Sequence, residues 1–316
     1  MSITIGRLGY MGLGIETNPG EAVSADVFLP FTEASMRGHH EPLEVISSKT
    51  SRLMDTDSVV GKKWSEGDVA VDADVANSGY LWKLALGNEV LTTGTPNYHE
   101  FYITASGNTP KTATLIFGRD TDVEQYVNAA VDELSLEVSD GIATMSCSFQ
   151  AKFPTTGAAQ TVTTTSGTVF SFKDMSVKFG ATLSAASQAS ATPINEISLN
   201  IANNLEVIHR SGDSDVSTIR TKGARVSGSY TVFFDSETDK NAYYNLSKRA
   251  MEITFVGNAN EELRIRIPEF RLSEDEISTG IDDFFVSSAS FIAEDKVDSG
   301  VRLMDARLSN DKGTVY

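Results

Sequence analysis

The chain has a single cysteine, Cys147, among its 316 residues, so it can form no disulfide within itself. No stretch approaches the roughly 20 apolar residues that a membrane-spanning helix needs. The start, MSITIGRLGYMGLG, lacks the basic segment and long apolar run of a signal peptide. These absences exclude a disulfide-stapled scaffold, and we expect a soluble protein, without a membrane partner, that folds in a reducing cytoplasm.

Basic residues are also scarce. The chain has 26 Lys and Arg against 43 Asp and Glu, a formal net charge of −17. A conventional nucleic-acid binder needs cationic side chains to neutralise phosphates, so this balance argues against that class. It suits instead a surface that repels nucleic acid. With 40% hydrophobic and 22% charged residues, the composition is typical of a chain that forms a core.

Patterns that carry chemistry are missing as well. The pair His39 and His40 has no cysteine or third spaced histidine beside it and is predicted to lie in a solvated loop. Residues 72–77 lack the spacing of a calcium loop, and the glycines of 9–14 lack the Lys-Ser/Thr ending of a phosphate loop. Cys147 falls within a strand pattern and is predicted to be a small core residue. We therefore expect no catalytic, metal or cofactor site, and no enzyme.

Alternating hydrophobicity dominates the chain and predicts a mainly β fold. Residues 123–134 also fit a helical stripe, and a strand is favoured for their second half because the matching segment later in the chain contains Pro268. Short helical patterns lie around residues 80–84 and 242–250. The predicted strands are 68–75, 101–103, 113–117, 134–138, 144–149, 170–177, 196–201, 229–234, 252–256, 263–267 and 284–293.

The tetrapeptide LEVI occurs twice, at residues 43–46 and 205–208. One repeated tetrapeptide is within chance, so the flanks decide whether the chain is duplicated. Each copy ends a strand and is followed by a long polar stretch, a glycine, an alternating strand, an aspartate and a short helical pattern. The matched positions are Gly67 with Gly228, Val69 with Tyr230, Val71 with Val232, Ala73 with Phe234 and Asp74 with Asp235.

The correspondence continues downstream in the same order. Residues 131–136 resemble 267–272, and residues 146–151 resemble 288–293. Between the copies, the threonine-rich segment 154–168 has the composition of a linker. The sequence therefore predicts two tandem β-sandwich or barrel domains, residues 1–155 and 166–316, each with one short flanking helix.

The two polar stretches, residues 47–65 and 209–225, are basic on an otherwise acidic chain. Charge complementarity then predicts that the loops of one copy stack on the acidic body of another. Two solvated loops of chance composition are the alternative. The basic residues are Lys49, Arg52, Lys62, Lys63, Arg210, Arg220, Lys222 and Arg225.

The N-terminal motif GLGIETNPGEAV (12–23) resembles the opening of major tail tube proteins of long-tailed, non-contractile bacteriophages. FLPFTE (28–33), the strand, long loop and strand of 44–74, and AAVDELSL (129–136) are similar to later parts of that family. The family often has Gly-Cys where this chain has Ala129-Ala130. The likeness covers most of the chain.

This resemblance implies a virion protein, assembled in the host cytoplasm, that stacks in rings into a tail tube. The tube is a conduit for double-stranded DNA, which passes without specific binding through an acidic lumen. A tape-measure protein and a tail terminator are the implied partners. Single-domain relatives are expected to form hexameric rings, so two domains per chain predict a trimeric ring of pseudo-sixfold shape, with a hexamer as the alternative.

The acidic side of the alternating strand is predicted to face that lumen. Its residues are Asp68, Asp72 and Asp74, with Asp235 in the second copy, where Phe233 takes the place of Asp72. Two other readings stay open, a terminator or connector that remains a single ring, and a tandem β-sandwich adhesin.

Overall fold

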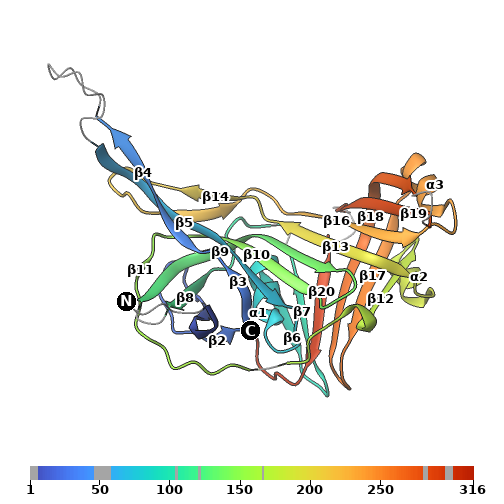
Figure 1. The fold of residues 1–316 in the computed structure, drawn as a ribbon, viewed down its shortest axis with the longest axis horizontal. Coiled ribbons are helices and arrows are strands. Elements are labelled where there is room, and N and C mark those ends of the chain that lie inside the picture. Colours follow the sequence, from blue (N-terminus) through green and yellow to red (C-terminus); the bar gives the residue numbers. More distant parts are fainter. Residues whose placement is uncertain are drawn as a thin grey trace.

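A computed structural model describes residues 6–45, 58–103, 106–119, 122–165, 167–279, 284–295 and 302–316. Antiparallel strands make up most of these residues, and three short α-helices accompany them. Figure 1 shows the strands running obliquely through the body, with one long hairpin projecting from it. The prediction of a mainly β fold is confirmed.

The strands of the first half precede those of the second along the chain. They are β1 (Tyr10–Ile15), β2 (Val27–Leu29), β3 (Phe31–Ala34), β4 (Arg37–Glu44), β5 (Ser58–Asp72), β6 (Asn88–Thr92), β7 (Asn97–Tyr102), β8 (Ala113–Arg119), β9 (Asp122–Val138), β10 (Thr144–Ala151) and β11 (Thr155–Thr156). There follow β12 (Met175–Gly180), β13 (Ile194–Ala202), β14 (Leu205–Ile208), β15 (Thr218–Thr221), β16 (Arg225–Phe233), β17 (Arg249–Val256), β18 (Glu262–Ser278), β19 (Val286–Ala293) and β20 (Asp305–Asn310).

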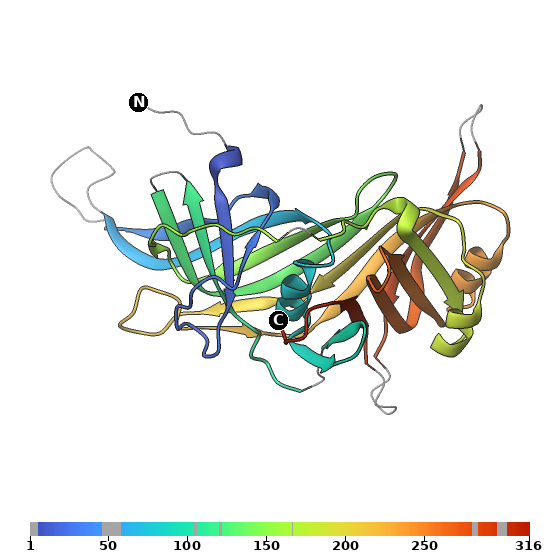
Figure 2. The same cartoon turned by 90° about the horizontal axis from the view of Figure 1, so that it is seen from below.

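The two halves of the chain have the same strand order. In the first half the neighbours run β1, β8, β9, β10, β5 and β3. In the second half they run β12, β17, β18, β19, β16 and β13. The halves are joined because β9 pairs with β13, and because β20 pairs with both β18 and β7. Figure 2 shows the later strands continuing alongside the earlier ones.

The irregularities of the sheets also repeat. The pairing of β3 with β5 shifts between Phe31 and Glu33, and that of β13 with β16 shifts between Ile194 and Glu196. A second shift falls at Ser148/Phe149 in the first half and at Leu272/Glu274 in the second. A bulge inserts one residue and increases the local twist. The two halves therefore bend at the same places.

The register corrects one part of the predicted alignment. Leu134 lies opposite Cys147, and Asp275 lies opposite the matching Ala289. The sequence pattern matched Leu134 with Phe270, but the strand register matches Leu134 with Asp275. The two alignments differ by five residues, an odd number. The sequence pattern allowed this because β18 carries a bulge between Ile267 and Phe270, which shifts its alternation by one residue.

One continuous hydrophobic core runs through both halves. It includes Leu13 of β1, Trp82, Leu199 of β13 and Phe291 of β19, each at most 1% exposed. Strand β10 shows the cause, because it buries every second side chain. The division into two domains with a linker at 154–168 stays a prediction, since strand pairing and core both cross between the halves.

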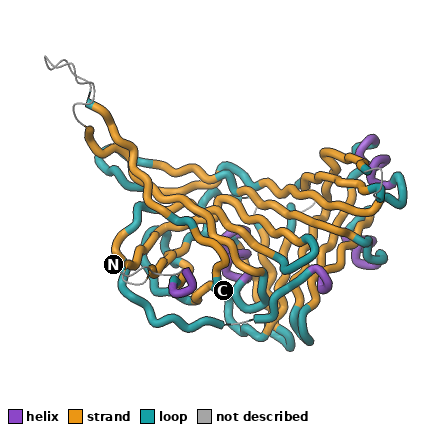
Figure 3. Tube along the Cα trace, viewed as in Figure 1, coloured by secondary structure: helices purple, strands orange, loops and turns teal. Residues whose placement is uncertain are grey.

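Helices, drawn in purple in Figure 3, are few, and they differ in burial. Helix α1 (Ser78–Leu86) is the predicted first helix; all its residues but Lys83 are buried, and it ends at Gly87 in the left-handed conformation, φ 85°. Helix α3 (Thr238–Tyr244) covers the start of the predicted 242–250 pattern. Helix α2 (Leu183–Gln188) was not predicted. None of the helices in the described parts of the chain is long and apolar enough to cross a membrane.

Most predicted strands are present, with three corrections. The whole of β9 is extended, so the strand favoured for the second half of 123–134 is confirmed and the helical alternative for the first half is wrong. Residues 172–174 form a 3-10 turn, because Ser171 donates its N–H and hydroxyl to Asp174 Oδ2 at 3.1 and 2.6 Å. His39 and His40 lie in β4 and not in a loop.

The two predicted basic loops also differ from expectation. Residues 58–65 belong to β5, which pairs with β4 in the projecting hairpin, here called the arm (37–44 and 58–65). The second stretch contains β15, which pairs with the preceding strand β14 in a short hairpin. That hairpin packs beside the arm, where the Lys63 N–H donates to the Ser214 carbonyl at 2.7 Å.

Candidate functional polar face

One face of the shared sheet is open and polar from end to end. Strands β5, β10, β9, β13, β16 and β19 lie side by side, and their register aligns polar side chains in rows. The first row is Asp72, Thr144, Glu137, Ser198, Ser229 and Ser290. The second is Ala70, Ser146, Ser135, Asn200 and Ser227, and the third is Asp68, Ser148, Glu133, Ala202 and Arg225.

We call these rows, with Glu196, Thr231 and Ser288 beside them, the open face. Five of its residues are acidic and Arg225 is basic, and the rest are small or amide side chains. The same strands turn alternate residues, such as Val69 and Leu136, into the core. Strand alternation alone therefore separates a dry interior from an acidic surface.

Neighbouring side chains of the open face form hydrogen bonds with one another. The Ser148 hydroxyl donates to Asp68, and the Asn200 amide donates to Glu133. Ser198 and Ser229 share a hydrogen bond at 3.0 Å between their hydroxyls. Several small or acidic side chains of the open face are therefore bonded to their neighbours.

Asp74 does not belong to this face. It is 5% exposed and accepts backbone hydrogen bonds from Ala76 and Asn77 at 2.7 and 2.6 Å. Burial raises its pKa despite these bonds. The prediction that Asp74 faces a lumen is therefore wrong, because the strand ends at Asp72 and the chain turns inward to start α1.

The other predicted lumen residues lie at the surface. Asp68 is exposed and Asp72 is half-buried, both on the open face. Asp235 is exposed beyond the end of β16, next to Phe233, whose side chain is 52% exposed. Whether any of them lines a tube stays a prediction.

The predicted stacking residues are distributed over four places. Lys62 and Lys63 lie on the arm. The Arg220 guanidinium on β15 donates to the Thr109 hydroxyl at 2.7 Å, and Lys222 pairs with Glu206 at 3.1 Å. Arg225 is on the open face, away from the arm. Arg210 is exposed after β14, and Lys49 and Arg52 lie outside the described residues.

Sequence reasoning missed Glu133, Glu137 and Glu196 as surface partners of Asp68. Each stands in a strand whose alternation was predicted, so the signal was present locally. Which strands adjoin could not be read from alternation, since the β9–β13 pairing joins residues about sixty positions apart.

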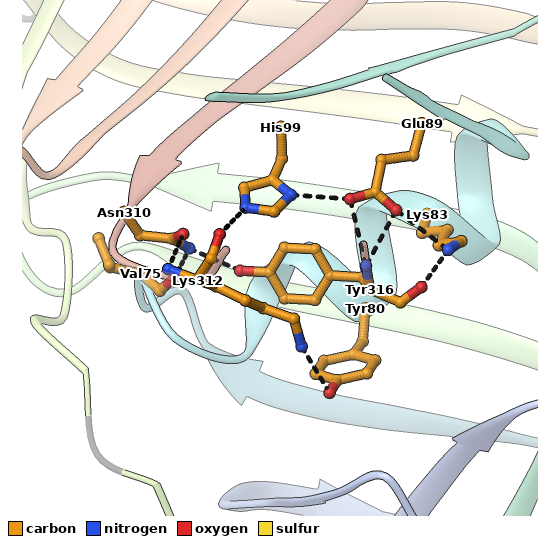
Figure 4. A network of polar contacts seen from close by, with 8 residues as sticks. All are labelled: Val75, Tyr80, Lys83, Glu89, His99, Asn310, Lys312 and Tyr316. Carbon is orange, nitrogen blue, oxygen red and sulfur yellow. Dashed lines mark hydrogen bonds and ion pairs between the residues drawn. The ribbon is translucent and has the colours of Figure 1, made fainter. Parts of the chain in front are cut away.

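A second polar cluster is buried and serves structure (Figure 4). The His99 ring lies 2.7 Å from Glu89 and 2.9 Å from the Lys312 carbonyl, and Lys83 pairs with Glu89 at 3.0 Å. Tyr316 packs in the middle of the cluster and is 6% exposed. Burial disfavours the Glu89 carboxylate, but hydrogen bonds from His99 and Lys83 outweigh it and lower its pKa.

No group of residues in the described chain could hold a metal ion. Cys147 is fully buried, and burial raises the pKa of its thiol, as suits the predicted core role.

Comparison with known proteins fits this picture. A search of curated protein sequences found no match. A family model described as phage tail tube protein matches residues 6–299, nearly the whole chain. The chain therefore belongs to the phage tail tube protein family and is a structural component of the virion tail.

Proposed function

We propose that copies of this chain close into rings that stack as a hollow tail tube, with the open face lining the lumen through which DNA is ejected. The observation that carries this proposal is the open face itself. It is a broad surface of the shared sheet that combines acidic residues with small polar ones. A DNA duplex presents phosphates on all sides, so a negative wall repels it and prevents adhesion.

The repeated strand order supports a ring with three chains. Two halves with the same order and the same bulges supply two wall segments per chain. Three chains then give six segments, and the chain acts as a duplicated tube module. The N-terminal motif favours a virion of the long-tailed, non-contractile class of phage.

Stacking is assigned to the arm and the hairpin β14–β15, which lie together at one end of the strands (Figure 1). Val59 and Val60 on the arm are each 56% exposed, and Lys62 beside them is exposed. Exposed apolar and cationic groups on a projecting hairpin suit contact with the acidic body of the next ring. A tape-measure protein inside the tube and a terminator at its end complete the proposed assembly.

The test combines microscopy with surface labelling. Purified protein should form hollow tubes in negative stain. In the variant Ser135→Cys, biotin attached before assembly should be hidden from streptavidin in tubes and accessible in free chains. Cys147 does not compete, because it is fully buried.

The matched control is Ser184→Cys on α2, which packs on the outer strands β12 and β17. Its biotin should stay accessible in tubes. Streptavidin binding at position 135 along intact tubes would refute a lumen position for the open face. Protein that stays dispersed under all assembly conditions would refute the tube.

A further inference from the structure

The pairing of β9 with β13 joins the two halves within one chain. Ser135 lies opposite Asn200 and Leu136 opposite Leu199 in an antiparallel ladder. Both leucines are at most 2% exposed. This junction is therefore a tight seam between two equivalent wall segments.

Each half also has a strand edge equivalent to one of the two edges that meet in this junction, and in the described part of the single chain these two equivalent edges have no strand paired to them. Among the described residues, β18 pairs from Arg271 to Ser278 only with β19, and residues 37–44 pair only with β5. By strand order, β18 corresponds to β9, and the β3–β4 segment corresponds to β13. The β18 edge of one copy could therefore pair with the β3–β4 edge of another copy, as β9 pairs with β13 within the chain.

We infer that β18 of one copy pairs with residues 36–39 of the next copy, in the register of the internal seam; this inference rests on the proposed ring. Arg37 faces Glu66 as Asn200 faces the matching Ser227. Glu276 faces Ser288 as Ser135 faces the matching Ser146. Since Ser135 lies opposite Asn200, Glu276 lies opposite Arg37 of the next copy.

The side chains on both edges suit this register. Ile277 comes opposite Met36, at the place of the buried Leu136–Leu199 pair, and Ile277 is 37% exposed in the single chain. Glu276 meets Arg37, both exposed, and Glu274 meets the ring of His39. An exposed apolar residue gains a cover and each carboxylate gains a hydrogen-bond donor.

Several contacts of the free chain must adjust, among them the hydrogen bond that Arg37 Nε donates to His39 Nε2 at 3.1 Å. The Met36 carbonyl accepts from the Tyr126 hydroxyl at 3.1 Å and from Arg119 at 3.3 Å. Ser35 donates its backbone N–H to the Asp68 carbonyl of β5. Because successive residues of a strand direct their backbone groups to opposite sides, the Met36 carbonyl points away from β5. In the seam that carbonyl accepts from the next copy, and Arg119 keeps its ion pair with Glu124 at 2.9 Å.

Disulfide trapping tests the register. Directly opposed residues in an antiparallel pair have Cα atoms about 4.5–5.5 Å apart, within the range a disulfide spans. The double variant Arg37→Cys/Glu276→Cys, oxidised after assembly, should give chains linked covalently into closed trimers on a non-reducing gel. Arg37→Cys/Glu274→Cys is the off-register control and should give at least ten-fold less cross-linked product.

A charge swap provides a second measure. Arg37→Glu alone and Glu276→Arg alone should each reduce the yield of tubes several-fold, and the double swap should restore it. Tubes that form without cross-links in the first pair, or without rescue by the swap, would overturn the register and leave the proposed function standing. Failure of the unmodified protein to form rings would instead overturn the proposed function.

Discussion

Gly67 and Gly228 occupy the same position in the two halves, each where a neighbouring strand passes against its Cα. A Cβ on Gly67 would lie 2.5 Å from Met36 Cα, and one on Gly228 would lie 2.2 Å from the Ser198 carbonyl oxygen. Ser198 pairs with β16 as Ser35 pairs with β5. Both glycines therefore permit the close crossing that follows the repeated bulge.

Replacing either glycine by alanine should destabilise the chain. We expect Gly67→Ala and Gly228→Ala to lower the free energy of unfolding by about 1–3 kcal/mol each, because backbone atoms have to move away. Chemical denaturation measures this. Gly141→Ala is the control, because a Cβ there has nothing within 4 Å, and its effect should be small. Equal effects at all three positions would contradict the close approach.

The buried cluster around Tyr316 predicts a pH dependence. The folded-state pKa of Glu89 is lowered, so its contribution is fully present above its unfolded value and is lost as pH falls through the folded pKa. Glu89→Gln should therefore cost about 1–3 kcal/mol at pH 7. The difference from the unmodified chain should shrink as the pH falls below about 4.

Denaturation at several pH values checks this. The exposed pair of Glu237 and Lys240, 3.1 Å apart, supplies the control, because Glu237→Gln should change stability little at any pH. A loss in Glu89→Gln that stays constant down to pH 3 would contradict the assignment.

Substitution of Asp74 should destabilise the chain, whereas substitution of Asp72 should not. Asp74→Ala removes the acceptor for two backbone N–H groups at the start of α1 and should lower the free energy of unfolding by about 1–2 kcal/mol. Asp72→Ala, on the open face, should leave stability nearly unchanged. Thermal denaturation separates them, and the reverse order would contradict the burial of Asp74.

Much of the fold could be predicted from sequence, because strand alternation is local. The alternation of 68–72 placed Val69 in the core and Asp68 at the surface correctly. It failed at Asp74, where a turn capped by that side chain replaces the strand. It also missed Glu133 and Glu196, since the open face depends on β9 meeting β13, a long-range pairing that no local pattern encodes.

The arm predicts a selective assembly defect. Val59 and Val60 are exposed, so Val59→Ser/Val60→Ser should barely alter the stability of the single chain but should shorten tubes several-fold. Val90→Ser on β6, which is 43% exposed, is the control and should leave tube length unchanged. Length distributions from negative stain measure this. Tubes of normal length in the arm variant would argue against stacking through the arm.

Electron cryomicroscopy of the assembled protein tests the central claim most directly. We predict a hollow tube whose rings each contain three chains, with Asp68, Glu133 and Glu137 facing the lumen. An open face buried between chains or turned to the outside, or a ring of six chains, would contradict it.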